Sequence, residues 1–224
     1  MIMTTTVDST TPTNGDGPTH PALRTLAKVI SVFFHPLFIP VYVSWFLIYV
    51  YPIFPAFTAR DKGIFLVRFL VMYTVFPLAT VLLAKGLGFI ESIYLNTQKD
   101  RIIPYVACGV YYFWMWYVLR NQMYPDEIEA FTLAIFLASS GGLLANSYFK
   151  VSMHAIGLGV MVAFMLVLAF LAVVPFGFYL SIAILIAGVV STSRLLTGDH
   201  HPFEVYVGLF IGMLAQLIAY WVVF

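Results

Sequence analysis

Most of the side chains that could do acid–base or phosphate chemistry stand in one short stretch near the end of the chain. This stretch, STSRLLTGDHHPFEVYVGLF, lies between apolar runs and contains Arg194, Asp199, His200, His201 and Glu204. Ionisable side chains beside apolar spans cost free energy unless they are paired, and they usually serve a function. The stretch is therefore the first candidate for a functional site.

Two shorter polar groups precede this stretch. The segment QKDR contains Lys99 and Arg101, and the segment VSMH contains Ser152 and His154. Guanidinium and ammonium groups bind phosphoryl oxygens and stabilise the charge that develops during phosphoryl transfer. Together with a serine hydroxyl and separate histidines, these cations favour a phosphate monoester as the ligand.

Two separate histidines and a nearby carboxylate could carry out phosphoryl transfer. One histidine can attack phosphorus while a second protonates the departing oxygen. A carboxylate bonded to the other ring nitrogen of the nucleophile would fix its tautomer. Glu204 follows His200 by four residues, so its side chain could reach back across one turn if a helix begins near Pro202.

Each of these residues also has a plainer interpretation. Lys and Arg at helix ends commonly extend to lipid headgroups, and we interpret Lys150 as such an anchor or a peripheral contact. Taken alone, His154 would be an interfacial histidine, and His35 is left as structural. The pair His200 and His201 could indicate a metal site, but the chain lacks the His-Glu-x-x-His spacing.

The composition identifies the chain as a membrane protein. Of its 224 residues, 62% are hydrophobic and only 9% are charged, whereas a soluble domain carries about a quarter charged residues. The net charge of +1 gives no reason to expect nucleic acid as a partner. The single cysteine, Cys108, excludes an internal disulfide.

The predicted fold is all-α, a polytopic membrane helix bundle. Apolar runs of about 20 residues, separated by polar or Pro/Gly segments, predict membrane-spanning helices. Seven are expected, near residues 29–51, 64–85, 103–120, 128–148, 154–174, 177–193 and 205–224. They form one domain, 25–224, preceded by a tail, 1–24, whose Thr, Pro, Gly and Asp content predicts disorder.

Seven spans place the polar groups on one side of the membrane. The loops at 86–101, 148–153 and 194–204 are separated by two helices each, so all three emerge on the face of the N-terminus. The sequence thus predicts that three distant loops converge on one site at one membrane surface. Lys and Arg are more frequent near the loops on this face than near those on the opposite face, which favours a cytoplasmic site. The excess disappears when the residues proposed to bind phosphate are left out, so the orientation stays open.

The longest polar stretch resembles a signature of the type 2 phosphatidic acid phosphatase superfamily. The third signature of that family is Ser-Arg, five residues, His, three residues, Asp. The segment SRLLTGDHHPFE is similar, with Ser193, Arg194, His200 and Glu204 in these places. It departs from the pattern in having Glu for Asp, which adds one methylene.

The other two signatures are matched in part. The second, Pro-Ser-Gly-His, is similar to VSMH, in which Ser152 and His154 hold their places and Met153 replaces the glycine. The first, Lys, six residues, Arg-Pro, is loosely similar to QKDRIIP, with Lys99 and Arg101 in a compressed spacing. A glycine has no side chain and would let the backbone approach phosphate closely, so Met153 is the departure that bears most on the chemistry.

The resemblance implies a role for each residue. His200 would be the nucleophile that forms a phosphohistidine, Glu204 would orient it, and His154 would be the acid for the leaving group and then the base for water. Neither a cofactor nor a metal would be required. The phosphate would be held by Lys99, Arg101, Ser152, the backbone amide near Met153, and Arg194.

The function implied is that of an integral-membrane phosphatase. Its substrates would be lipids that carry a phosphate monoester or pyrophosphate, such as phosphatidate, phosphatidylglycerol phosphate, a polyprenyl diphosphate or lipid A. Its partners would be that lipid phosphate and the surrounding membrane lipids. In a bacterium, the protein would lie in the inner membrane. The alternative is a non-catalytic binder or carrier of anionic lipids, which would keep the cations but need neither histidine.

Overall fold

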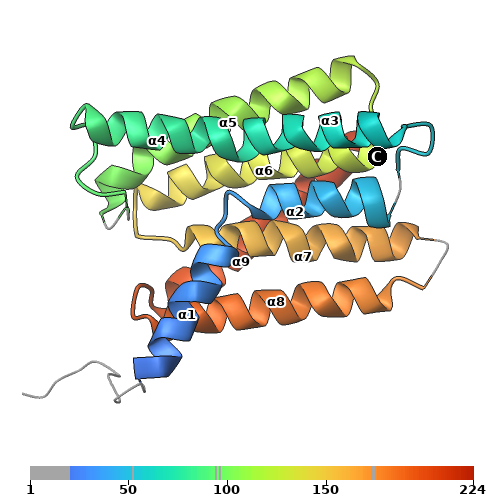
Figure 1. The fold of residues 1–224 in the computed structure, drawn as a ribbon. Helices are drawn as coiled ribbons and strands as arrows, with labels where there is room; N and C mark the ends of the chain where they lie inside the picture. Colours follow the sequence, from blue (N-terminus) through green and yellow to red (C-terminus); the bar gives the residue numbers. More distant parts are fainter. Residues whose placement is uncertain (1–20, 52, 94, 96, 173–174) are drawn as a thin grey trace, which may run out of the picture.

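The structure, a computed structural model, confirms the all-α membrane bundle. It describes residues 21–51, 53–93, 95, 97–172 and 175–224, and within them every regular element is a helix. Six helices are long and apolar enough to cross a membrane, and they run lengthwise beside one another (Figure 1). The predicted tail, 1–24, lies mostly outside the described residues, and the first helix begins within it.

The six long helices include one that is interrupted by a π-helical turn. They are α3–η2–α4 (Ala59–Leu70, Val71–Val75 and Phe76–Gly86), α5 (Gln98–Asn121), α6 (Asp126–Asn146), α7 (Met153–Leu171), α8 (Gly177–Leu196) and α9 (Pro202–Val223). Large apolar side chains, among them Leu185, Phe170 and Trp221, are exposed on their outer faces. Such an apolar surface suits hydrocarbon rather than water. A helix can cross hydrocarbon because the backbone groups along its span bond within the helix.

The segment predicted as the first span, 29–51, is divided in the structure. It forms the end of α1 (Pro21–Phe33) and then α2 (Ile39–Trp45), which continues as the π-helical turn η1 (Phe46–Val50). A proline disfavours helical geometry at the residue before it, and Pro36 does so at His35, two residues after α1 ends at Phe33. The apolar helix after the break rises about 18 Å at 1.5 Å per residue, which is too short to cross the membrane alone.

Helix α1 turns its polar side toward the bundle and its apolar side outward. An Arg24 Nη2 donates to the Thr197 carbonyl at 3.4 Å, and Ser31 is buried. Leu26, Val29 and Phe33 are exposed on the opposite side. This polarity is the reverse of that of a surface helix in water, and it suits a helix that separates polar groups of the bundle from lipid.

Glycines bring α7 and α9 into backbone contact. A Cβ atom on Gly212 would lie 2.1 Å from the Ile156 carbonyl oxygen, and one on Gly159 would lie 2.2 Å from the Leu209 carbonyl oxygen. Close approach through small residues is a general way for membrane helices to pack. The crossing draws the starts of α7 and α9 together.

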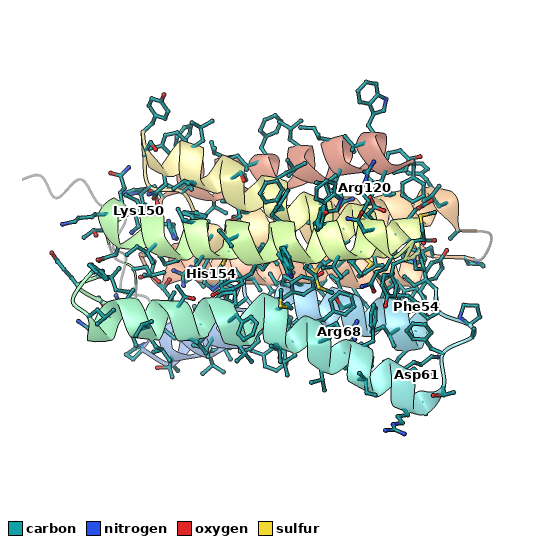
Figure 2. The ribbon with its side chains drawn as sticks, turned by 90° about the horizontal axis from the view of Figure 1, so that it is seen from above. Phe54, Asp61, Arg68, Arg120, Lys150 and His154 are labelled. Atoms are coloured by element: carbon teal, nitrogen blue, oxygen red, sulfur yellow. The ribbon has the colours of Figure 1, made fainter. Side chains whose placement is uncertain are left out.

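The connections α4–α5, α6–α7 and α8–α9 lie at one end of the bundle, as the predicted topology required (Figure 1). In Figure 2, Lys150 and His154 lie toward this end, whereas Phe54 and Asp61 lie toward the other. Helices α5, α7 and α9 all begin at this end, so their unpaired backbone N–H groups face the same region.

We expect Gly212→Val to destabilise the fold, because its added atoms would overlap the backbone of α7 rather than a movable side chain. Overpacking typically costs about 1–3 kcal/mol, and a backbone neighbour leaves little room for relief. Thermal unfolding in detergent measures the effect. Gly188→Val is the matched control, since a Cβ at Gly188 meets no atom within 4 Å; equal unfolding temperatures of the two variants would contradict the role of the crossing.

Candidate active site

His200 and Glu204 form the shortest polar contact of the α8–α9 connection. Helix α9 begins at Pro202 and carries Glu204 in its first turn, as the spacing predicted. His200 Nδ1 lies 2.5 Å from Glu204 Oε2, and His200 is buried. Because a carboxylate accepts, Nδ1 carries the proton in this bond, and in the neutral ring Nε2 keeps the lone pair.

The start of α7 lies against the same segment. The Ser152 N–H donates to the Glu204 carbonyl oxygen at 3.2 Å, and the fully buried Ser152 hydroxyl caps α7 by accepting from the Ala155 N–H at 3.4 Å. In the described part of the chain, the backbone N–H groups of Met153 and His154 have no acceptor. A helix start with free N–H groups is suited to an anion.

The Met153 side chain packs against a buried apolar cluster that includes Val81, Ile90 and Leu95. The residue that replaces the expected glycine is thus part of the apolar packing beside the start of α7.

His154 is held from the side of α1. Its Nε2 lies 3.0 Å from the Ser31 carbonyl oxygen, which can only accept, so Nε2 carries a proton and Nδ1 is the nitrogen left for exchange. The ring also packs edge to face on His35, with centroids 5.5 Å apart and an interplanar angle of 78°. The sequence pattern gave no sign of either contact.

Arg101 is turned into the protein from the first turn of α5. Its Nε donates to the Leu95 carbonyl oxygen at 2.8 Å and its Nη1 to the Val151 carbonyl oxygen at 2.7 Å, and only 4% of the residue is exposed. These bonds tie the α4–α5 and α6–α7 connections together. They leave the Nη2 group of Arg101 for a ligand.

Arg194 enters the site from the last turn of α8. Its Nη2 pairs with Asp199 Oδ2 at 2.9 Å. Its Nε is buried and has no partner among the described residues. A buried donor without a partner costs free energy unless a ligand or water satisfies it, so Arg194 is the strongest single indication of an anion at this place.

Lys150, and not Lys99, is the lysine that reaches the cluster. Lys150 Nζ donates to the Asp199 carbonyl oxygen at 2.8 Å. Lys99 is exposed, and within the described residues it makes no hydrogen bond or ion pair. Residues two apart on a helix do not face each other, so with Arg101 turned inward, Lys99 points elsewhere.

Three cations act on His200 together. Burial lowers its pKa from 6.5 to about 4, the Glu204 hydrogen bond opposes this, and the charges of Arg101, Arg194 and Lys150 add to the lowering. His200 is therefore neutral at pH 7, with a free lone pair on Nε2. The contacts that join the three loops are the hydrogen bonds of Arg101 to the Leu95 and Val151 carbonyls and of Lys150 to the Asp199 carbonyl.

The site offers cations and helix N–H groups rather than a set of metal ligands. Among the described residues, no three or more His, Cys, Asp or Glu side chains are grouped so that they could hold a metal ion.

Comparisons of the chain with protein-family models, curated proteins and solved structures gave no match.

We expect the His200 imidazole to titrate well below the ordinary histidine value. Because its pKa is lowered, the ring stays neutral as the pH falls through 6.5 and becomes protonated only near 4. Histidine NMR titration of the protein in nanodiscs measures this. Lys150→Ala should raise the midpoint by removing a nearby charge, and Glu204→Gln should lower it by removing the bond that favours the protonated ring. A midpoint near 6.5 in the wild type would contradict the assignment of a buried, cation-surrounded ring.

Proposed function

We propose that the chain is a membrane-embedded phosphatase that hydrolyses a phosphate monoester or pyrophosphate of a lipid through a phosphohistidine on His200. The 2.5 Å bond between His200 Nδ1 and Glu204 Oε2 carries the proposal. It fixes the tautomer that leaves Nε2 free, in a buried place beside Arg101, Arg194 and Lys150. The similarity to the signatures of the type 2 phosphatidic acid phosphatase superfamily supports the same chemistry.

The phosphoryl group would bind between the cations and the start of α7. Among the residues that the structure describes, Arg194 Nε and the N–H groups of Met153 and His154 have no hydrogen-bond partner. Arg101, Lys150 and Arg194 outnumber the nearby carboxylates of Asp199 and Glu204, so the region favours a phosphate dianion. Charge-assisted bonds of this kind are also the ones that strengthen as charge develops in phosphoryl transfer.

The first step would move the phosphoryl group from the lipid to His200. The Nε2 lone pair attacks phosphorus, a P–N bond forms, and the P–O bond to the lipid breaks. Protonated His154 gives a proton from Nδ1 to the departing oxygen, while its Nε2–H stays on the Ser31 carbonyl. Glu204 stabilises the charge that His200 gains.

The second step would release phosphate. His154, now neutral at Nδ1, takes a proton from a water molecule whose oxygen attacks phosphorus. The P–N bond breaks, and both histidines return to their starting states. Acid and base are thus the same residue, used in opposite directions.

His200→Ala should abolish turnover, because no nucleophile is left. Glu204→Gln should lower kcat by roughly 10²–10⁴-fold with little change in binding, since tautomer control is lost. Release of phosphate from a panel of lipid phosphates in detergent micelles measures both. His201→Ala is the matched histidine control, because His201 is exposed and makes no side-chain cap of α9. Near-normal turnover of His200→Ala would overturn the phosphohistidine mechanism.

Hydrolysis should tolerate EDTA and be blocked by vanadate. In the proposed route Arg101, Arg194 and Lys150 supply the charge stabilisation, and vanadate mimics the pentacoordinate phosphorus that they would bind. A metal-assisted route would fail on chelation. Loss of activity with EDTA that a divalent ion restores would assign His200 and His201 as ligands. Tight binding of lipid phosphates without hydrolysis would favour the non-catalytic carrier.

A further inference from the structure

His35 lies at the break between α1 and α2, directly beside His154. Its Nδ1 accepts the Leu37 N–H at 3.3 Å, so in the neutral ring the proton is on Nε2. The break is fastened by Thr74, whose hydroxyl donates to the Leu37 carbonyl oxygen at 2.7 Å. Burial, and then the charge of Arg194, lower the pKa of His35 to about 4, so a neutral ring faces His154 without charge repulsion.

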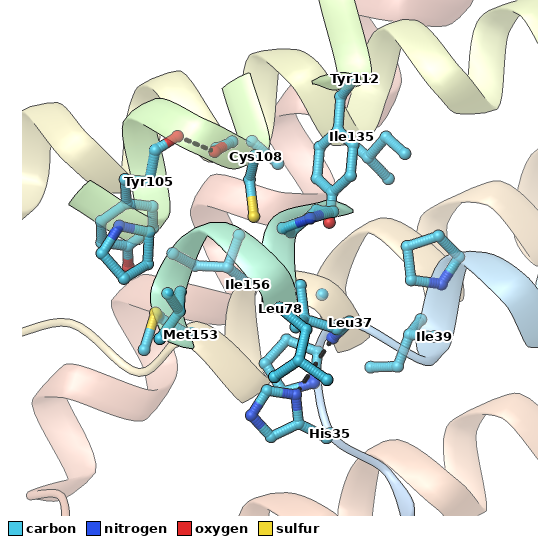
Figure 3. A pocket seen from close by; sticks show the side chains of 18 of the residues that line it. His35, Leu37, Ile39, Leu78, Tyr105, Cys108, Tyr112, Ile135, Met153 and Ile156 are labelled. Carbon is cyan, nitrogen blue, oxygen red and sulfur yellow. Dashed lines mark hydrogen bonds between the residues drawn. The ribbon is translucent and has the colours of Figure 1, made fainter. Parts of the chain in front are cut away.

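An apolar cavity of about 230 Å³ begins at His35 and Met153. It extends between α2, α4, α5, α6 and α7, and Figure 3 shows His35, Leu78, Cys108 and Met153 around it. The cavity therefore adjoins the polar cluster on the side where His154 meets His35.

Most hydroxyl groups in the cavity wall are already bonded to the protein. The Ser139 hydroxyl donates to the Tyr105 carbonyl oxygen at 2.9 Å, and the Tyr112 hydroxyl donates to the Tyr73 carbonyl oxygen at 3.4 Å. Of the described lining residues, only Tyr105 has a buried hydroxyl without a partner. The wall thus suits an apolar chain better than the ester groups of a glycerolipid.

We propose that His35 is a positioning residue for His154, and that the cavity which His35 lines receives the apolar chain of the substrate. This proposal rests on the proposed function. The oxygen that His154 protonates is the one that joins phosphate to the rest of the lipid, so the chain must leave the site on the side of His154. The His35 ring packs on His154 and also lines the cavity, so the cavity adjoins His154 through His35.

The volume of the cavity narrows the substrate class. An apolar cavity of about 150 Å³ accommodates benzene, so one of about 230 Å³ takes roughly nine carbons of a single chain. Two acyl chains would not fit side by side within the cavity, which is open enough for the far end of one chain to continue outside it. We therefore expect substrates whose phosphate or pyrophosphate is attached directly to one apolar chain, of the isoprenyl or alkyl kind, to be preferred over diacylglycerol phosphates.

Comparing substrates with poor and good leaving groups distinguishes a positioning role of His35 from a merely structural one. His35→Ala should lower kcat at least ten-fold for decyl phosphate, whose poor leaving group needs the proton from His154, and much less for para-nitrophenyl phosphate. His35→Phe should restore most of the rate, because it keeps the edge-to-face contact with His154. Equal losses with both substrates, or a Phe variant as slow as the Ala variant while equally folded, would overturn the positioning role.

Filling the cavity tests the chain site. Val81→Trp should lower kcat/KM at least ten-fold for decyl and isoprenyl phosphates and leave that for para-nitrophenyl phosphate unchanged. Val189→Trp is the matched control, since Val81 is buried in the cavity wall and Val189 is 41% exposed on α8. Because a tryptophan could unfold the chain, the wild type provides a second measurement: kcat/KM should rise with alkyl length and level off near roughly nine carbons.

The two failures are distinguishable. If the wild type hydrolyses neither para-nitrophenyl phosphate nor any lipid phosphate, the proposed function is wrong. If it hydrolyses para-nitrophenyl phosphate but shows no dependence on chain length, or prefers phosphatidate to isoprenyl and alkyl phosphates, only the chain site is wrong.

Discussion

The close crossing of α7 and α9 holds the candidate site together. Nothing like the hydrophobic effect drives helices together inside a membrane, so close packing of small residues takes its place. At Gly159 and Gly212 the two backbones touch, and about two turns nearer the helix starts the Ser152 N–H reaches the Glu204 carbonyl oxygen. The starts of both helices are therefore linked directly. This links Glu204, which is bonded to His200, with the helix turn that carries His154.

The charged side chains of the site also link the connections that carry them. Arg101 donates to carbonyl groups of the α4–α5 and α6–α7 connections, and Lys150 donates to the Asp199 carbonyl in the α8–α9 connection. Buried charge is expensive unless it is hydrogen-bonded, and these bonds lower that cost while they fix the loops. Arg194 Nε has no partner among the described residues, and in the proposed function it would bind the phosphate. The same cations thus join the connections and would also set the proposed preference for an anion.

The features of the fold that follow from the length of apolar runs and the spacing of residues could be predicted from the sequence. Apolar length predicted the six long helices, parity of the spans predicted the shared end, and the four-residue spacing predicted the contact of His200 with Glu204. Features that depend on contacts with residues distant in the sequence could not be predicted in this way. A proline in an apolar run can kink a helix or end it, and at Pro36 the packing of Thr74 against Leu37 accompanies an end. Likewise, spacing alone does not tell which of Lys99 and Arg101 turns inward.

The break before α2 is the feature that connects the polar and apolar parts of the site. A continuous span over 29–51 would keep its carbonyl groups bonded within the helix, whereas the end of α1 leaves the Ser31 carbonyl free to accept from His154. It also sets His35 at the boundary between the cations and the apolar cavity. Carbonyl groups at the end of a buried helix need a partner from elsewhere in the protein. Tyr42 supplies it for Phe33, and His154 supplies it for Ser31. The hydrogen bond that lowers the cost of ending α1 is therefore the same bond that positions the proposed acid.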